Sequence, residues 1–217
     1  MVGKRNSTEE LAQRDFLHRF FHDLATPLSA VSLHLEGADR RVKRGADPTE
    51  SLAVARAELS RAFDLFEQGR ECLLHSGRAP ETFSFDDFVA FTIHQNGASN
   101  VTIEGETAGR VTGDRSDLSQ ALLALLGNAL ETASPESISI RLVREGGLLR
   151  VRIENPGRLP ADDPDALFSP RATRPGRNWG MGLPRARLYA AAAGGTVRLE
   201  QREDRVIATL ELPEETA

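Results

Sequence analysis

The chain has 217 residues, of which 40% are hydrophobic and 27% charged, a balance typical of a soluble globular protein with one or two domains. The formal net charge of -5 gives no electrostatic reason to expect binding to nucleic acid or to an anionic membrane surface. The single cysteine, Cys72, excludes an internal disulfide framework and a cysteine-based zinc cluster, and it fits a reducing compartment.

The sequence from Ser7 to Gly45 predicts one long helix. Its start "MVGKRNSTEE" lacks the apolar core of a signal peptide, and no run in the chain is long enough to span a bilayer. Ser7 followed by Glu10 has the spacing of a capping box, and Gly45 is a good residue to end the helix. Apolar residues recur between them at helical spacing: Leu17, Phe20, Leu24, Leu28, Val31 and Leu35. We therefore expect a cytoplasmic protein without membrane insertion that begins with an amphipathic helix.

A second helix is predicted directly afterwards. Asp47, Pro48 and Glu50 form a strong start signal, and "HSG" at 75–77 ends the helical pattern. Its apolar stripe comprises Leu52, Leu59, Phe63, Phe66 and Leu73. Two long helices joined by a short loop form an antiparallel hairpin, which cannot bury its apolar face alone. We therefore predict that residues 1–80 pair with a second copy, giving a homodimer built on a four-helix bundle.

Residues 81–217 show a different pattern, because short strands alternate with helices. Strands are expected at 101–105, 137–143, 148–155, 195–201 and 205–212, and "REGG" at 144–147 makes the second and third of them a hairpin. Helices are expected near 85–96, 114–132 and 182–193. This order predicts an α+β sandwich in which helices cover one face of a sheet.

His22 is expected to face away from the core of the hairpin. At about 100° of rotation per residue, it lies roughly 150° from the mean direction of the apolar stripe of the first helix. An exposed histidine on a helix can be an ordinary surface residue. However, Asp23 can hold one imidazole nitrogen as N–H and leave the other free as a nucleophile, and Pro27 opens the helix one turn later.

The stretch "FHDLATPLSAVSLHLE" resembles the phosphoacceptor motif of two-component sensor histidine kinases. The resemblance implies that His22 is the phosphorylated histidine and that Asp23 assists proton transfer. It also implies that Thr26 helps to place a water for phosphatase action. A phosphoacceptor helix needs an ATP-binding domain as its phosphoryl donor. The rest of the sequence should therefore contain such a domain.

Two segments of the second half resemble the nucleotide site of the same family. "DLSQALLALLGNALETASP" resembles its asparagine-bearing helix, which implies that Asn128 binds Mg²⁺ and phosphate. The apolar surroundings suggest a buried asparagine, and a satisfied core amide or a helix cap is the alternative interpretation. "VRIENPGRLP" resembles the first glycine-rich box, with Asn155 in place of the usual aspartate at the adenine and Gly157 in the turn. An asparagine oxygen can still accept a hydrogen bond from the adenine amino group.

The segment "LFSPRATRPGRNWGMGLPRARLYAAAAGG" resembles the lid and second glycine box of the family. Gly180, Gly182 and Leu183 lead into a helix, where glycines let the backbone approach phosphates and the helix N-terminus favours their negative charge. Arg174, with Arg171 and Arg177, can contact phosphates or lie in a solvated loop. The resemblance implies an ATPase sandwich of the gyrase, heat-shock-chaperone and histidine-kinase type.

The leading hypothesis is a cytoplasmic histidine kinase that uses ATP and Mg²⁺ to phosphorylate His22 and passes the phosphoryl group to a response-regulator receiver domain. The alternative is a histidine phosphotransfer or scaffold protein with a non-catalytic ATP-binding domain. Asn155 and Ala124 favour it, because both depart from the family pattern. A third interpretation, a kinase resembling anti-sigma factors, is disfavoured because such proteins lack the phosphoacceptor hairpin.

Overall fold

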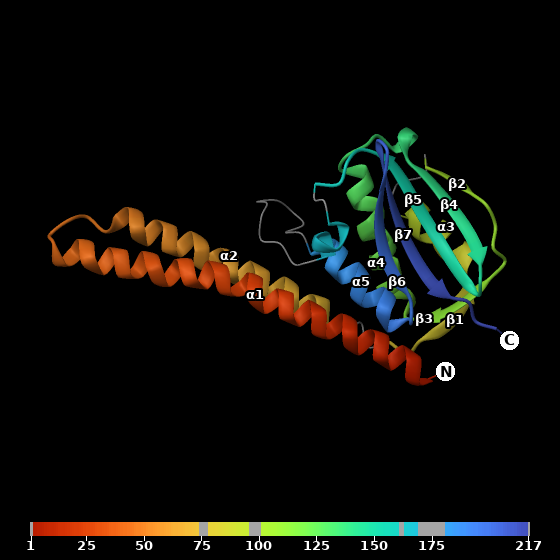
Figure 1. Cartoon of the computed structure of the whole chain (residues 1–217), viewed down its shortest axis with the longest axis horizontal. Coiled ribbons are helices and arrows are strands. Elements are labelled where there is room, and N and C mark those ends of the chain that lie inside the picture. Colours follow the sequence, from red (N-terminus) through yellow and green to blue (C-terminus); the bar gives the residue numbers. More distant parts are fainter. Residues whose placement is uncertain (1, 74–77, 96–100, 161–162, 169–180, 217) are drawn as a thin grey trace.

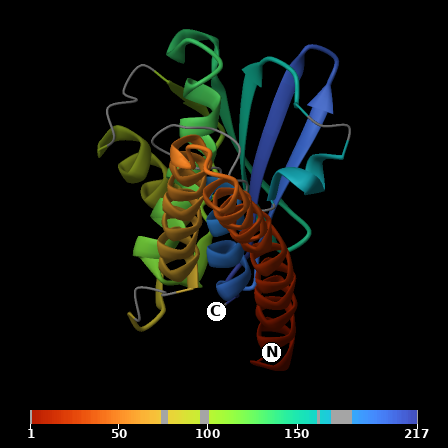
Figure 2. The ribbon, with the colours of Figure 1, turned by 90° about the vertical axis from the view of Figure 1, so that its left-hand side faces the viewer.

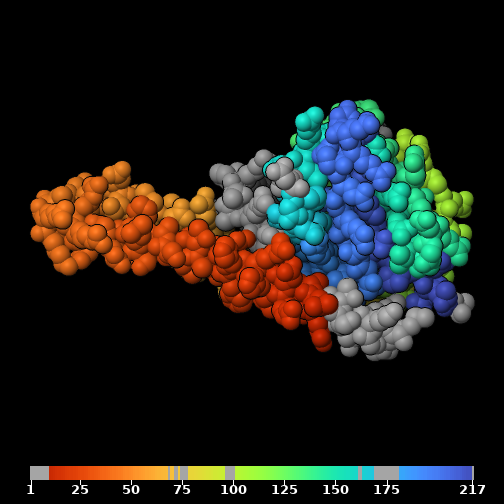
Figure 3. Space-filling model, in the orientation of Figure 1, coloured from red at the N-terminus to blue at the C-terminus, as the bar shows by residue number. Residues whose placement is uncertain are grey.

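The computed structural model describes residues 2–73, 78–95, 101–160, 163–168 and 181–216. Two long helices, α1 (Val2–Lys43) and α2 (Thr49–Leu73), form a hairpin whose loop end projects beyond the rest of the molecule (Figures 1 and 3). The predicted helix start at Ser7 is wrong, because α1 already begins at Val2 and Ser7 lies inside it. None of the helices in the described part of the chain combines the length and the apolar character that a bilayer crossing requires.

The loop of the hairpin follows the start and stop signals of the sequence. Gly45 has a φ of 71°, its N–H donates to the Val42 carbonyl, and the Ala46 N–H donates to the Arg41 carbonyl. These two bonds satisfy the last carbonyls of α1 as a Schellman motif does. Asp47 accepts hydrogen bonds from the hydroxyl (2.6 Å) and the N–H (2.9 Å) of Thr49, and these bonds hold its pKa below the ordinary value.

Small residues let the two helices of the hairpin approach closely. Ala38 from α1 and Ala55 and Ala62 from α2 are all buried. Gly69 of α2 lies under the ring of Phe20, so that a Cβ atom added there would come within 2.2 Å of the ring. Most of the large apolar side chains of the hairpin therefore remain on its outer surface.

An α+β sandwich follows the hairpin (Figures 1 and 2). Its five-stranded sheet has the order β2-β4-β5-β7-β6, in which β2 pairs with β4 in parallel and the other pairs are antiparallel. The strands are β2 (Thr102–Glu104), β4 (Ser139–Glu145), β5 (Leu148–Pro156), β6 (Thr196–Arg202) and β7 (Arg205–Pro213). Helices α3 (Phe85–Gln95), α4 (Arg115–Leu130) and α5 (Gly182–Ala192) lie on one face of this sheet, and short 3₁₀ turns span Pro135–Ser137 (η1) and Pro164–Phe168 (η2).

The sequence predicted these strands and helices to within two or three residues at their ends, but it missed one pair. β1 (Glu81–Ser84) and β3 (Arg110–Gly113) form a separate two-stranded antiparallel sheet. The predicted "REGG" hairpin is present, with Gly146 (φ 60°) and Gly147 (φ 74°) joining β4 to β5. The core lies between the sheet and the three helices, where Phe85, Phe88, Leu122 and Ile153 are almost completely buried.

The hairpin packs against the sandwich through α1 and α5 (Figure 1). Phe16 and Phe20 of α1 are buried in the same cluster as the core of the sandwich, and their rings stack with centroids 5.8 Å apart. Arg19 donates a hydrogen bond of 3.2 Å to the Asp165 carbonyl in η2. In this docked arrangement, α1 therefore makes an apolar contact with α5 and a polar contact with η2.

Candidate active site

His22 lies in the middle of α1 on the surface that faces solvent. Its side chain is 78% exposed, whereas Phe20 and Pro27 on the opposite side of the helix are buried. Nδ1 of His22 lies 3.3 Å from Oδ1 of Asp23. This contact favours the tautomer with the proton on Nδ1, which leaves the lone pair of Nε2 exposed to solvent. The prediction that His22 points away from the core is confirmed.

Pro27 interrupts the hydrogen-bond ladder of α1 next to His22. Proline has no N–H, so the Asp23 carbonyl loses its usual partner four residues later. Ser29 donates a hydrogen bond of 2.8 Å to the Ala25 carbonyl, a bond of the kind that often bends a helix. The axis of α1 curves between its two halves (Figure 2). Thr26 is exposed in this stretch, one turn after His22.

Asn128 lies in the last turn of α4 and is exposed. The expectation of a buried asparagine is therefore wrong, because the apolar residues around it in sequence occupy the other side of α4, where Leu122, Leu125 and Leu126 are buried. The side chain of Asn128 forms no hydrogen bond with any residue in the described part of the chain, so its amide oxygen can bind a ligand. The described residues include no group of three His, Cys, Asp or Glu side chains that could hold a metal ion.

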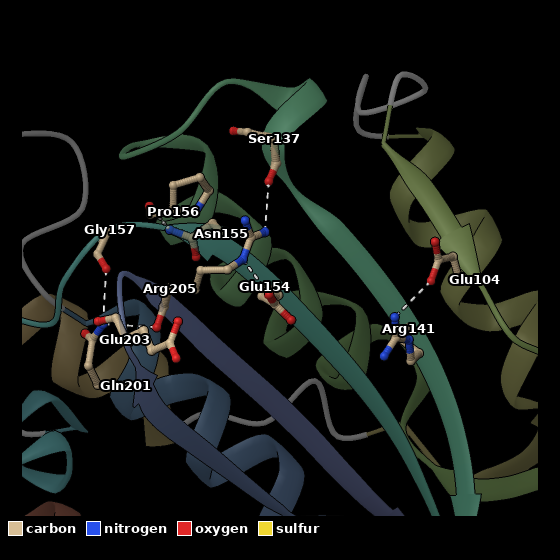
Figure 4. Close-up of polar contacts among 10 residues, drawn as sticks. All are labelled: Glu104, Ser137, Arg141, Glu154, Asn155, Pro156, Gly157, Gln201, Glu203 and Arg205. Atoms are coloured by element: carbon tan, nitrogen blue, oxygen red, sulfur yellow. Dashed lines mark hydrogen bonds and ion pairs between the residues drawn. The ribbon is translucent and has the colours of Figure 1, made fainter.

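Asn155 is the last residue but one of β5 and is almost completely buried, with 5% of its surface exposed. Its Nδ2 atom donates to the Pro156 carbonyl (2.9 Å) and to Oγ1 of Thr132 (3.0 Å) (Figure 4 shows the first of these). Gly157 follows with a φ of 142°, which favours glycine, and its N–H donates to the Asp204 carbonyl. Asn155 and Gly157 thus lie together in one hydrogen-bonded turn.

Gln201 of β6 holds this turn against the loop between β6 and β7 (Figure 4). Its Nε2 atom lies 3.2 Å from the Gly157 carbonyl, and its Oε1 atom accepts a hydrogen bond from the Leu159 N–H at 2.8 Å. Nε2 also contacts the Glu203 and Arg205 carbonyls. Sequence reasoning missed Gln201 and Thr132, since neither belongs to a recognisable motif.

Gly182 and Leu183 form the first turn of α5. The first hydrogen bond of this helix runs from the Arg185 N–H to the Met181 carbonyl. The N–H groups of Gly182 and Leu183 therefore have no partner inside the helix, and they make no hydrogen bond to any other backbone group of the described residues, so they suit an anion. Ala124 of α4 lies against this turn, since a Cβ atom added to Gly182 would be 3.6 Å from the Ala124 Cβ. Arg174 and Gly180, also predicted to contact phosphates, lie outside the described residues.

Residues 113–216 match the family described as histidine kinase-, DNA gyrase B-, and HSP90-like ATPase. These residues form an ATPase domain of that family. An alignment 211 residues long, which covers 88% of this chain, shows 27% identity to the sensor-like histidine kinase SenX3 of Mycolicibacterium smegmatis. The resemblance to two-component sensor histidine kinases is thereby confirmed. The chain spans about half (54%) of the length of SenX3.

Solved structures of histidine kinases share the fold of this chain over most of its length. The Acinetobacter baumannii histidine kinase AdeS matches 90% of this chain and 98% of its own, with a TM-score of 0.54 and 21% identity. The mycobacterial sensor histidine kinase MprB matches 63% of this chain and 99% of its own, with a TM-score of 0.53 and 21% identity. At this level of identity, the two structures are similar to the present one in fold alone.

Proposed function

We propose that this chain is the core of a cytoplasmic histidine kinase, in which the ATPase domain supplies a phosphoryl group to His22. The observation that carries the proposal is the exposed His22–Asp23 pair on α1, in the same chain as an ATPase domain of the histidine kinase type. A solvent-facing imidazole with one nitrogen held by a carboxylate is suited to nucleophilic attack.

The proposed reaction forms a bond between Nε2 of His22 and the γ-phosphorus of ATP and breaks the bond from that phosphorus to the bridging oxygen, so that ADP leaves. Nδ1 keeps its proton during attack, and Asp23 accepts that proton from the phosphorylated ring. Most of the rate enhancement in such transfers comes from positioning and charge neutralisation. His22 lies on a different side of α1 from Phe20, which is buried in the cluster that includes the core of the ATPase domain. Transfer within one chain would therefore require the domain to leave its docked position.

The nucleotide would bind between α4, α5 and the turn at Asn155. Asn155 would accept a hydrogen bond from the adenine amino group, with Gly157 in the same turn, and Gly182, Leu183 and the lid residues Gly180 and Arg174 would hold phosphates. Asn128 offers one amide oxygen to Mg²⁺, which fits an ion that takes only one or two protein ligands beside substrate phosphates and water. Mg²⁺ would neutralise charge on the phosphates.

A homodimer is the second part of the proposal. The outer surface of the hairpin carries exposed large apolar side chains, among them Phe63, which is 62% exposed. Several of them repeat at intervals of seven residues, which is typical of a helix-bundle seam: Leu28 and Leu35 on α1, and Leu52, Leu59 and Phe66 on α2. A second copy of the hairpin would cover this surface. The phosphoryl group would then pass from His22 to an aspartate of a receiver domain docked on α1, and Thr26 would support the reverse, dephosphorylating reaction.

Two residues favour the alternative of a phosphotransfer or scaffold protein. Ala124 presents a methyl group at the first turn of α5, where the family pattern has a second asparagine, so one polar group is absent beside the proposed phosphate site. Asn155 also lacks the charge that a carboxylate would bring to the adenine.

Incubation with γ-labelled ATP and Mg²⁺ separates the two functions. A kinase retains label that is labile in acid and stable in alkali, as expected for phosphohistidine. Tight nucleotide binding without label would refute the kinase. If the protein neither binds nucleotide nor retains label, but accepts a phosphoryl group from a phosphorylated receiver domain, the phosphotransfer function is supported instead.

A further inference from the structure

Two hydrogen-bond acceptors fix the orientation of the Asn155 side-chain amide. Its nitrogen, Nδ2, lies 2.9 Å from the Pro156 carbonyl and 3.0 Å from Oγ1 of Thr132. A carbonyl oxygen can only accept a hydrogen bond. The nitrogen must therefore face Pro156, because the reversed amide would place two oxygens against each other.

The hydroxyl group of Thr132 reinforces this orientation from the end of α4. Its Oγ1 atom lies 3.2 Å from the Ala129 carbonyl and 3.4 Å from the Asn128 carbonyl, so the hydroxyl proton points back into the last turn of the helix. Only the lone pairs of Oγ1 remain for Asn155. The hydrogen bonds thus run in one direction, from Asn155 through Thr132 to α4.

The oxygen of the Asn155 amide remains without a donor in the described part of the chain. Held in this way, the neutral amide presents only a hydrogen-bond acceptor to its ligand, as an ionised carboxylate would. A free asparagine could instead turn its NH₂ group toward the ligand and accommodate either kind of purine.

We propose that Thr132 is a positioning residue that makes Asn155 selective for 6-aminopurine nucleotides over 6-oxopurine nucleotides. The inference rests on the proposed function, in which the base binds at Asn155. The 6-amino group of adenine donates to the fixed oxygen, whereas the 6-oxo group of hypoxanthine or guanine would meet it as a second acceptor. Loss of the Thr132 hydroxyl leaves the Pro156 carbonyl as the single acceptor for Nδ2, and the amide can then reverse more easily.

The test compares the binding of ATP and inosine triphosphate, which differ at position 6 of the purine, by titration calorimetry on the whole chain. Wild type should prefer ATP. Thr132→Val should reduce the ratio of the two affinities about 3- to 10-fold, the effect of one neutral hydrogen bond, whereas Thr132→Ser, which keeps the hydroxyl, should preserve it. Thermal melts of each variant establish that it is folded.

A second pair of variants separates orientation of the amide from a merely structural role. Asn155→Asp presents oxygens in either orientation, so it should keep the preference for ATP, and adding Thr132→Val to it should leave the affinity ratio unchanged. The inference would be overturned if Thr132→Val alone left the ratio of ATP to inosine triphosphate affinity unchanged. It would also be overturned if Thr132→Val lowered that ratio equally in the wild-type and Asn155→Asp backgrounds. Equal binding of ATP and inosine triphosphate by wild type also overturns it but leaves the proposed function intact, whereas binding of neither refutes both.

Discussion

Nδ1 of His22 and Oδ1 of Asp23 lie 3.3 Å apart on the exposed side of α1. The contact joins neighbouring residues, so it needs no support from the rest of the fold. It orients the imidazole and gives the ring proton an acceptor at the moment when the other nitrogen would bond to phosphorus.

Asp23→Asn tests this relationship. The amide keeps the size of the side chain but cannot take up the ring proton, so we expect the rate of ATP-dependent labelling to fall about 100-fold, within the range of general acid–base effects. Asp39→Asn is a control, since Asp39 is another carboxylate on α1 but pairs with Lys43. A labelling rate in Asp23→Asn equal to that of the control would contradict the proposed role.

Arg19 connects α1 to the ATPase domain through its hydrogen bond to the Asp165 carbonyl. Asp165 is itself held by Arg187, whose guanidinium lies 3.7 Å from the centre of the Phe168 ring. We expect Arg19→Ala to weaken the docked arrangement and to raise the labelling rate about 2- to 5-fold, the effect of one exposed hydrogen bond. Arg40→Ala, which removes an arginine paired only with Glu36 in the hydrogen bonds and ion pairs of the described residues, should leave that rate unchanged. A slower rate in Arg19→Ala would instead indicate that the docked arrangement is the productive one.

The exposed apolar surface of the hairpin predicts the effect of a charge at Phe63. Each copy would bury one such ring in the dimer, and burial of a phenylalanine is worth about 1.5–3 kcal/mol. Phe63→Glu should therefore raise the dimer dissociation constant about 100-fold or more, as measured by analytical ultracentrifugation. Phe91→Glu on α3 alters another exposed ring away from the hairpin and should not change the dissociation constant. Dimers of unchanged stability in Phe63→Glu would place the interface elsewhere.

Gly69 provides a test of the packing between α1 and α2. A Cβ atom at this position would meet the Phe20 ring at 2.2 Å, so Gly69→Ala should lower the free energy of unfolding by about 1–3 kcal/mol despite the better helix propensity of alanine. Gly37→Ala is the matched control, because the nearest atom to its added Cβ would be Oγ of Ser51 at 3.8 Å. That variant should gain up to about 1 kcal/mol in urea unfolding. Equal effects in the two variants would show that Phe20 moves aside without cost.

Local chemistry explains which parts of the fold were predictable from sequence. Gly45, Asp47 and "REGG" each satisfy backbone groups within a few residues, so their positions in the chain predict the turns directly. β1 and β3 were missed because each has only four residues and is stabilised by a partner about thirty positions away. Pairing between strands so far apart in the chain leaves no recognisable pattern in the local sequence.

The residues of the candidate site also differ in how far the sequence predicted them. The orientation of His22 followed from helical rotation alone, because α1 stays helical through His22 despite Pro27. The exposure of Asn128 did not follow, since an apolar sequence cannot distinguish a helix buried on all sides from one that is open at its last turn. Thr132, just after α4, and Gln201 of β6 were missed because they act through contacts with the turn at Asn155, and such contacts have no motif.

The most direct test of the kinase function is the location of the phosphoryl group. After incubation with ATP and Mg²⁺, the whole chain is digested at neutral to alkaline pH and analysed by mass spectrometry, with His22→Gln and His18→Gln as variants. We predict phosphate on His22 in wild type and in His18→Gln, and none on this helix in His22→Gln. Phosphate that persists in His22→Gln, or that lies on another residue of the wild-type chain, would contradict it.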